Sequence, residues 1–222
     1  MTIVYHPEVV QGSIEWATMR SGLLTASEMS LIITPTLKAA SNEKEKTHLF
    51  ELLAQRITGY VEPSYISDNM LRGWTNEILA RDLYSEKYAP VQEVGFVTND
   101  DWKFKIGYSP DGLVGNDGLI ECKSRLQKYQ AQTIAENEVP KDFIIQIQTG
   151  LLVTGRQWCD YISYCGGMPM FVKRVEADPD IHDAIIQAAM AFEKHMVEKL
   201  ENYRLVSADL YMTEWQNEDE II

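Results

Sequence analysis

The sequence contains few cysteines and no long apolar segment. Its three cysteines, Cys122, Cys159 and Cys165, form no Cys-x-x-Cys pair, which argues against a disulfide framework and against a zinc or iron–sulfur site built from thiolates. No apolar run approaches the roughly 18 residues of a membrane-spanning helix, and the amino-terminal residues lack the basic start and apolar stretch of a secretion signal. We therefore expect a protein of the reducing cytoplasm that has no membrane partner.

Basic residues are also scarce. The chain has 20 lysines and arginines against 33 aspartates and glutamates, which gives a net charge of −13. Such a chain has no general cationic coat for nucleic acid or anionic membranes, but this balance does not exclude a local basic groove. Part of the acidity lies in a tail from about residue 214, which has acidic residues and no basic one. This tail is expected to be flexible and solvated.

The order of apolar and turn-forming residues predicts one domain over residues 1–222 that contains both helices and strands. The length and the 45% hydrophobic content suit a single sizeable core, and no internal repeat or long linker interrupts it. Apolar residues at helical spacing and capping residues predict helices at residues 13–20, 25–33, 42–57, 68–84, 128–138, 141–153 and 179–200. Segments that flank turn residues predict strands at residues 91–98, 102–106, 110–114, 119–123, 158–164 and 170–175. These elements indicate the α+β class, with a mixed central β-sheet flanked by helices.

The most informative stretch is Ser109-Pro110-Asp111, followed after nine residues by Glu121-Cys122-Lys123. Side chains alternate along a strand, so the carboxylate of Glu121 and the amine of Lys123 share one face. If the intervening Asn/Asp/Gly turn folds the two strands together, Asp111 comes beside Glu121. Two carboxylates and the backbone carbonyl of Cys122 can then hold a hard divalent cation, with Lys123 orienting an attacking water. This chemistry is that of metal-assisted hydrolysis of a phosphodiester bond.

The pattern P-D followed by E-x-K resembles the superfamily of metal-dependent nucleases that is named after it. Because the motif is short, it has a second interpretation, in which a surface turn is followed by an exposed Glu/Lys pair on a strand. The alternation also turns Cys122 away from the charged face. We therefore expect its side chain to fill the core and not to act as a nucleophile.

Further blocks resemble the phage λ exonuclease family, the viral recombinase nucleases. In chain order the blocks are Gln11-Gly12-Ser13, Glu15-Trp16, Arg20, Gly22, Thr25-Ala26-Ser27-Glu28, Leu71-Arg72-Gly73, Glu77, Tyr108-Ser109-Pro110-Asp111-Gly112-Leu113, Glu121-Cys122-Lys123 and Gln146-Ile147-Gln148. They follow the order of the family from residue 11 to about residue 154, and several ordered blocks are far more specific than one. The resemblance implies a restriction-endonuclease-like nuclease core.

The same resemblance implies roles for the residues of the catalytic site. The implied ligands of Mg²⁺ or Mn²⁺, with two ions in each active site, are Asp111, Glu121 and the backbone carbonyl of Cys122. Lys123 and Gln148 would act on the attacking water or the scissile phosphate, and Glu77 would complete the site. Taken alone, Glu77 is more typical of a solvated helix residue, and the same holds for Gln148.

A second group of residues matches those that receive the 5′-phosphate of a DNA end in the family. This group consists of Arg20, Ser27 and Ser109. A guanidinium group binds phosphate through two hydrogen bonds, and hydroxyl groups suit an anion. Taken alone, Arg20 would suit a surface ion pair and Ser27 a helix cap. Trp16 matches a position where a ring stacks on the DNA end, with packing in the core as the alternative. A further basic residue after the E-x-K strand is Arg125 or Lys128, of which we favour Arg125.

The resemblance implies a metal-dependent 5′ to 3′ exonuclease that degrades one strand of linear double-stranded DNA to 5′-mononucleotides and leaves a 3′ single strand for recombination. It also implies a homotrimeric ring around DNA, a phage-type single-strand annealing protein as partner, and a phage or prophage gene expressed in the bacterial cytoplasm. Two alternatives remain. One is another nuclease of the superfamily, structure-specific or helicase-associated, although the iron–sulfur members need four cysteines. The other is an inactive DNA-end binder or acidic DNA mimic, which has no need of Lys123 beside paired carboxylates.

Overall fold

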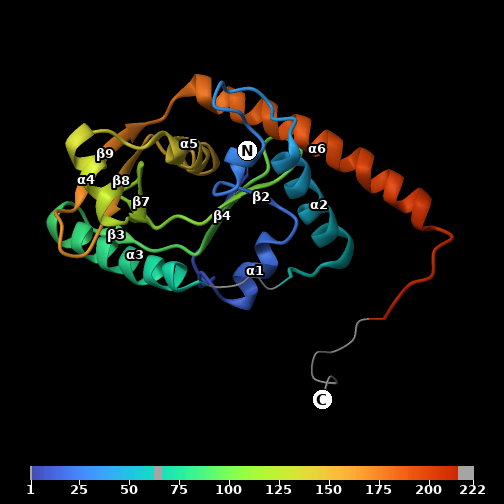
Figure 1. Cartoon of the computed structure of the whole chain (residues 1–222), viewed down its shortest axis with the longest axis horizontal. Coiled ribbons are helices and arrows are strands. Elements are labelled where there is room, and N and C mark those ends of the chain that lie inside the picture. Colours follow the sequence, from blue (N-terminus) through green and yellow to red (C-terminus); the bar gives the residue numbers. More distant parts are fainter. Residues whose placement is uncertain (1, 63–66, 215–222) are drawn as a thin grey trace, which may run out of the picture.

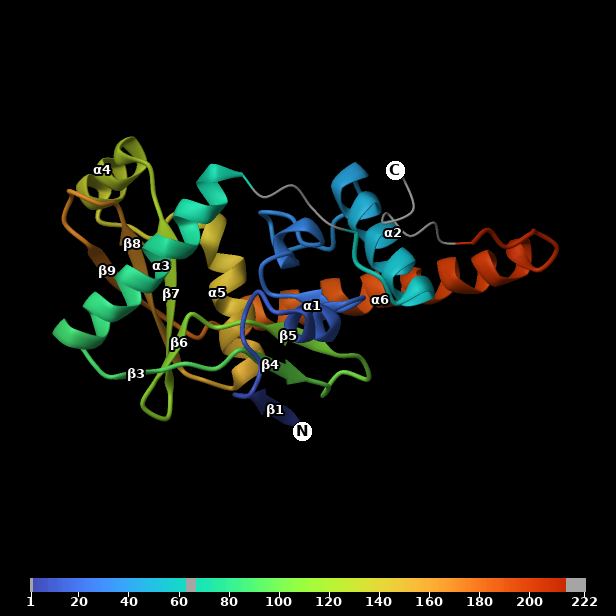
Figure 2. The ribbon, with the colours of Figure 1, turned by 90° about the horizontal axis from the view of Figure 1, so that it is seen from below.

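A computed structural model describes residues 2–62 and 67–214 of the chain (Figure 1). Its helices are α1 (Ile14–Arg20), α2 (Glu43–Thr58), α3 (Asp68–Lys87), α4 (Gln127–Glu136), α5 (Lys141–Thr154) and α6 (Pro179–Ser207). The second half of α6 projects away from the rest of the molecule (Figures 1 and 2). Among the described residues, no helix has the length and apolar character needed to cross a membrane. The predicted acidic tail lies outside the described residues except for its first residue, Glu214.

The strands form two sheets, whereas the sequence predicted one central sheet. The four-stranded sheet has the order β1 (Ile3–His6), β4 (Phe96–Asn99), β5 (Ile106–Tyr108) and β2 (Leu24–Thr25). The five-stranded sheet has the order β3 (Val91–Gln92), β6 (Gly112–Val114), β7 (Gly118–Ser124), β8 (Trp158–Tyr164) and β9 (Phe171–Glu176). Both sheets are mixed, because β2 pairs in parallel with β5 and β7 pairs in parallel with β8. The predicted α+β class with mixed sheet and flanking helices is therefore confirmed.

The predicted helix at residues 25–33 is wrong. Thr25 belongs to β2 and pairs with Gly107 of β5, and the next backbone amide, that of Ala26, donates to the carbonyl of Gly107. Only a short 3₁₀ turn, η1 (Met29–Leu31), follows. Met29 and Ala26 are buried in the main core, so tertiary pairing and burial decide the conformation of this segment against its local helical pattern.

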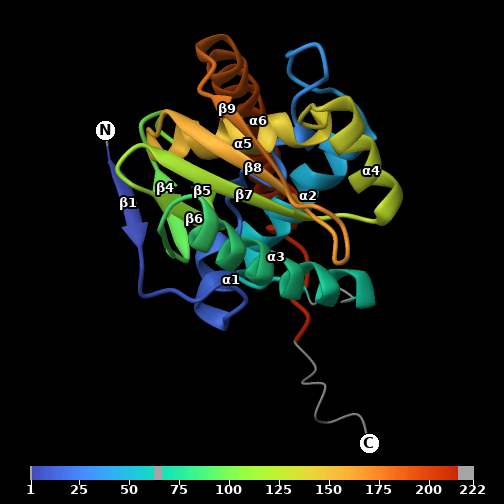
Figure 3. The same ribbon diagram turned by 90° about the vertical axis from the view of Figure 1, so that its left-hand side faces the viewer.

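Helices α3 and α5 cover opposite faces of the five-stranded sheet (Figures 2 and 3). On the α3 side, buried apolar residues of the helix and the sheet pack together: Ala80, Tyr84, Ile120, Cys122 and Ile162. On the α5 side, Ile147 and Leu151 pack in the main core with Leu119 of β7. Alternate residues of β7 thus face the two helices, which leaves Glu121 and Lys123 on the α5 side. Cys122 is buried and free, as expected from the alternation.

A hydrogen-bond network at Asp160 of β8 fixes α3 on the sheet. The hydroxyl of Tyr84 in α3 donates to Asp160 Oδ2 at 2.6 Å, and Arg174 of β9 donates to both carboxylate oxygens at 2.8 and 2.9 Å. The Arg174 guanidinium carbon also lies 3.4 Å from the centre of the Trp158 ring. Burial and the carboxylate of Asp160 raise the pKa of Tyr84, so its hydroxyl remains a donor. The helix that carries Glu77 is therefore anchored about two turns beyond that residue.

Candidate active site

Two carboxylates and one amine meet where β6 begins beside β7. Asp111 directly precedes β6, and Glu121 and Lys123 lie on β7, which pairs antiparallel with β6. The backbone amide of Cys122 donates to Asp111 Oδ2 at 2.6 Å, so the Asp111 side chain reaches across to the neighbouring strand. Lys123 Nζ lies 2.7 Å from Glu121 Oε1. The hairpin proposed from the sequence thus brings these three side chains together.

Glu121 is the most buried member of the group, with 2% of its surface exposed. Besides Lys123, it accepts hydrogen bonds from Gln146 Nε2 of α5 at 2.5 Å and from the Tyr108 hydroxyl of β5 at 3.0 Å. Gly150 allows α5 to lie this close, because a Cβ atom there would be 2.7 Å from a ring carbon of Tyr108. A buried carboxylate needs such donors, so packing fixes its position.

The charges of this group perturb one another. Burial raises the pKa of Asp111 well above its ordinary range, and the charge of Glu121 adds to the rise. Burial alone would lower the pKa of Lys123, but the charges of Glu121 and Asp111 outweigh it and raise that pKa. Lys123 therefore stays an ammonium group. Burial also raises the pKa of the Cys122 thiol, which does not favour a thiolate.

Glu77 of α3 lies close to the same group. Burial raises its pKa, the ammonium group of Lys123 opposes this rise, and the charge of Glu121 adds to it. The carboxylates of Asp111, Glu121 and Glu77 therefore lie near a single positive charge, that of Lys123. Such an excess of negative charge in a partly buried place is stabilised when a cation binds there.

The donor set at this position fits a hard divalent cation. The possible ligands are the carboxylate oxygens of Asp111, just before β6, and of Glu121 on β7, together with the backbone carbonyl of Cys122 on β7. All are oxygen atoms, which Mg²⁺ prefers. In residues 2–62 and 67–214, no three His, Cys, Asp or Glu side chains converge closely enough to form a metal site by themselves. The backbone carbonyl and oxygens from water or substrate are therefore needed to complete the coordination, as is usual for Mg²⁺.

The residues predicted to receive a 5′-phosphate also form a cluster. Arg20, at the end of α1, approaches the hydroxyl groups of Ser109, Thr25 and Ser27 at 3.4, 3.3 and 3.5 Å. Its guanidinium carbon lies 4.5 Å from the centre of the Trp16 ring, and Trp16 Nε1 donates to the Ser109 hydroxyl at 2.8 Å. Burial lowers the pKa of Arg20, and the negative charge of Glu28 partly offsets this lowering. Because Ser109 stands two residues before Asp111, this cluster adjoins the site formed by Asp111, Glu121 and Lys123.

Other predicted residues lie elsewhere. Gln148 is buried, and its amide group is used by the fold: Nε2 donates to the carbonyl of Glu176, and Oε1 accepts from the amide of Asp178. In this structure Gln146, and not Gln148, bonds to Glu121, and a role of Gln148 in catalysis stays a prediction. Lys128 lies over the ring of Tyr129, and neither Lys128 nor Arg125 has a recorded contact with the cluster around Arg20.

Sequence reasoning missed Gln146 and Tyr108 as partners of Glu121. Residues two positions apart on a helix face different directions, so one of Gln146 and Gln148 had to point away from the site. Periodicity does not show which one, because α5 is buried along most of its second half. Tyr108 stands in the block that resembles the family, but its contact with Glu121 depends on how the two sheets pack.

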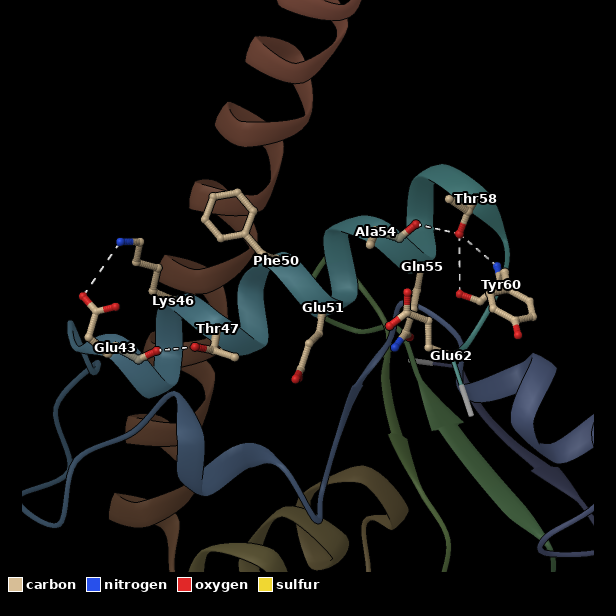
Figure 4. A pocket seen from close by; sticks show the side chains of 10 residues that line it. All are labelled: Glu43, Lys46, Thr47, Phe50, Glu51, Ala54, Gln55, Thr58, Tyr60 and Glu62. Carbon is tan, nitrogen blue, oxygen red and sulfur yellow. Dashed lines mark hydrogen bonds and ion pairs between the residues drawn. The ribbon is translucent and has the colours of Figure 1, made fainter. Parts of the chain in front are cut away.

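A surface cavity of about 710 Å³ lies along α2, apart from the carboxylate group (Figure 4). Its polar side chains bond largely to their own helix: Lys46 pairs with Glu43 at 3.8 Å, and the Thr47 hydroxyl donates to the Glu43 carbonyl at 2.8 Å. The lining side chains are spread along the helix and do not converge on one point (Figure 4). The cavity therefore lacks the convergent groups of an active site.

The mixed sheet with a carboxylate pair and a lysine on adjacent strands defines a restriction-endonuclease-like nuclease fold. Residues 15–157 match the YqaJ-like viral recombinase domain, and the chain belongs to this family. The resemblance to the λ exonuclease family noted in the sequence is thereby confirmed. No curated protein matches the chain significantly.

Solved structures agree with this assignment. An alkaline exonuclease, LHK-Exo from Laribacter hongkongensis, is 33% identical, with a TM-score of 0.80 over 90% of this chain and 100% of the relative. A structure of LHK-Exo in complex with dAMP gives 34% identity and a TM-score of 0.79 over the same shares. A phage-related exonuclease from Haemophilus somnus, at 13% identity and a TM-score of 0.62 over 81% of this chain and 96% of its own, shares the fold. The family and the two LHK-Exo structures support a DNA nuclease of the exonuclease class.

The excess charge predicts that Asp111→Asn stabilises the metal-free protein. The amide keeps an oxygen that can accept from Cys122 and removes one of the repelling charges. The melting temperature should rise by about 2 °C or more, since 1 kcal/mol corresponds to roughly 2–4 °C in a chain of this size. MgCl₂ should raise the melting temperature of the parent protein but not that of the variant. Asp117→Asn, in the exposed turn between β6 and β7, is the matched control. It should change neither the melting temperature of the metal-free protein nor its rise with MgCl₂. A lower melting temperature for metal-free Asp111→Asn would contradict the charge argument.

The two glutamines of α5 give a matched pair of variants. Gln146→Ala removes a hydrogen bond to the Glu121 carboxylate, worth about 1.5–3 kcal/mol, so digestion of linear DNA should slow by roughly 10- to 100-fold. Gln148→Ala leaves the carbonyl of Glu176 and the amide of Asp178, both part-buried, without their side-chain partner. It should cost about 1 kcal/mol of unfolding free energy and should slow digestion less than Gln146→Ala does. Initial rates and urea unfolding of both variants check this. The opposite pattern would restore Gln148 to the catalytic group.

Proposed function

We propose that the chain is a divalent-metal-dependent 5′ to 3′ exonuclease that degrades one strand of linear double-stranded DNA to 5′-mononucleotides and leaves a 3′ single strand. The observation that carries this proposal is the direct adjacency of the carboxylate–lysine group to the Arg20 cluster, linked by the segment from Ser109 to Asp111. A hydrolytic centre beside a pocket for a terminal phosphate suits cleavage from a 5′ end. The complex of LHK-Exo with dAMP, a 5′-mononucleotide, supports the same product.

In this mechanism Asp111, Glu121 and the Cys122 carbonyl hold the cation, Mg²⁺ or Mn²⁺, with two ions in the site. A cation held by these residues would stabilise negative charge on the phosphate oxygens during in-line attack. Lys123 donates hydrogen bonds from its ammonium group and orients the attacking water or the scissile phosphate. Gln146 and Tyr108 hold Glu121 in place, and the raised pKa of Tyr108, due to burial and to Glu121, keeps its hydroxyl a donor. Glu77 accepts hydrogen bonds from the water at the edge of the group.

Arg20 and the hydroxyl groups of Ser27 and Ser109 bind the 5′-phosphate. The Arg20 guanidinium group lies within 3.5 Å of both hydroxyl oxygens, so all three groups can turn toward one phosphate. The nearby indole of Trp16 can stack on the terminal base. Binding of the terminal phosphate there places the first phosphodiester bond toward Asp111. The adjacency of the two sites supports digestion from a 5′ end.

The assembly and the setting belong to the same proposal. We place the enzyme in a homotrimeric ring around the duplex, in the cytoplasm of a bacterial host, with a phage-type single-strand annealing protein as partner that loads onto the exposed 3′ strand. A ring would reconcile a net charge of −13 with DNA binding, because basic residues can line the channel while acidic residues face solvent.

Linear duplex labelled at either the 5′ or the 3′ end tests activity and polarity together. With Mg²⁺, the 5′ label should appear in mononucleotides from the first turnovers, while the 3′ label stays in long products. Lys123→Ala and Asp111→Ala should abolish digestion and largely keep binding to DNA ends, because the Arg20 cluster is intact. Lys199→Ala, on the exposed side of α6, is the matched control with full activity. Digestion by both catalytic-site variants at the parental rate would overturn the catalytic assignment, and early release of the 3′ label would reverse the polarity.

The cluster around Arg20 predicts a preference for 5′-phosphorylated ends over 5′-hydroxyl ends. Arg20→Ala should remove this preference by slowing digestion of the phosphorylated duplex alone. Arg20→Lys should restore only part of it, since an ammonium group cannot form the two parallel hydrogen bonds of a guanidinium. Initial rates on the two duplexes measure the effect. Equal rates on both ends for the parent protein would refute this role.

A further inference from the structure

A second basic pocket lies at the end of β7, between the start of α4 and the N-terminal half of α3. It has a volume of about 480 Å³. The residues that line it are Arg72, Asn76, Arg125, Leu126, Gln127, Cys165 and Gly166. Two arginines therefore share one concave surface with no acidic residue in its lining.

The arginines of this pocket are not neutralised by the fold. Within the described part of the chain, neither Arg72 nor Arg125 forms an ion pair with a described carboxylate, although acids outnumber bases by 33 to 20. The guanidinium carbon of Arg125 lies 4.9 Å from the ring centre of Tyr129 and 5.1 Å from that of Phe143. Its Nε atom is buried without a hydrogen-bond partner. The two rings thus hold the guanidinium group in place, and no described residue takes up its terminal N–H donors.

The start of α4 adds to the positive character of the pocket. Leu126, the N-cap residue, supplies no side-chain acceptor to the first turn of this ten-residue helix, and Leu126 and Gln127 both line the pocket. The backbone amides of a first turn favour an anion when no cap satisfies them. A planar guanidinium beside such amides suits a phosphate group.

The pocket adjoins the candidate active site on two elements. Arg125 follows Lys123 by two residues, roughly 7 Å along an extended chain. On α3, Asn76 precedes Glu77, and Asn76 Nδ2 donates to the hydroxyl of Ser124 at 2.8 Å. The pocket shares no lining residue with the cluster around Arg20, whose partners come from α1, β2 and the segment before β6. Two basic groups thus stand near the carboxylates and are built from different elements.

We propose that this pocket binds an internal backbone phosphate of the DNA, distinct from the terminal 5′-phosphate held at Arg20. The proposal rests on the proposed function, since it needs a DNA substrate at the carboxylate group. Arg72 and Arg125 contact the phosphate oxygens, and the amides at the start of α4 face the same group. This contact holds the strand beyond the scissile bond and does not read its sequence.

Binding of fluorescently labelled linear duplex, with Ca²⁺ in place of Mg²⁺ to prevent digestion, tests the pocket. Arg72→Gln and Arg125→Gln should each weaken binding about 3- to 10-fold, equally for duplexes with a 5′-phosphate and with a 5′-hydroxyl. Each variant should lower the slope of log affinity against log salt concentration by about 1, as expected for one lost phosphate contact. Arg125→Lys should recover part of the affinity. Arg204→Gln, at the exposed end of α6, removes the same charge and should change neither quantity.

The outcomes separate the pocket from the proposed function. A loss confined to the 5′-phosphorylated duplex would assign the arginines to the terminal phosphate and overturn the proposal. Parental affinity and slope in Arg72→Gln, whose exposed side chain is not needed for folding, would also overturn it while leaving the exonuclease intact. A parent protein that digests no linear duplex and binds neither end overturns both. Thermal melting of each variant controls for loss of fold at Arg125.

Discussion

The carboxylate of Glu121 is buried among donors that come from three elements. Lys123 of β7, Gln146 of α5 and Tyr108 of β5 satisfy its two oxygens. An ionised carboxylate in such a place costs several kcal/mol unless it is paired and hydrogen-bonded. Because Tyr108 belongs to the four-stranded sheet and Glu121 to the five-stranded one, this requirement also ties the two sheets together at the site. The packing of α5 against Tyr108, which Gly150 permits, is therefore part of the catalytic geometry.

The acidity of the chain acquires a different meaning once the structure is known. Asp111, Glu121 and Glu77 gather negative charge around one lysine, and this charge favours a cation. The arginines that suit phosphate, in contrast, stand in two local groups that are built from different elements. Field lines in a cleft depend on the nearby charges more than on the net charge of the molecule. A strongly acidic protein can therefore bind DNA at one place while its outer surface repels it.

Local patterns in the sequence predicted much of the fold and part of the site. The alternation in Glu121-Cys122-Lys123 gave the correct faces, because strand geometry alone determines them. The segment at residues 25–33 was mispredicted, because its pairing partner, β5, lies about 80 residues further along the chain. Gln146 and Gln148 differ only in the direction in which α5 presents them, which is a property of tertiary packing. The contact from Tyr108 to Glu121 crosses between sheets, and no local pattern contains it.

Helix α3 connects the hydrogen-bond network at Asp160 to the carboxylates of the candidate active site and to the second basic pocket. Its C-terminal half is fixed by the bond from Tyr84 to Asp160, which Arg174 completes, and by apolar packing against β7 and β8. Its N-terminal half carries Glu77 toward the carboxylates and Arg72 toward the second basic pocket. A helix is stiff over such a length, so the anchored end sets the position of the other. The Asp160 network thus lies toward the other end of the helix from Arg72, yet it fixes the position from which Glu77 and Arg72 project.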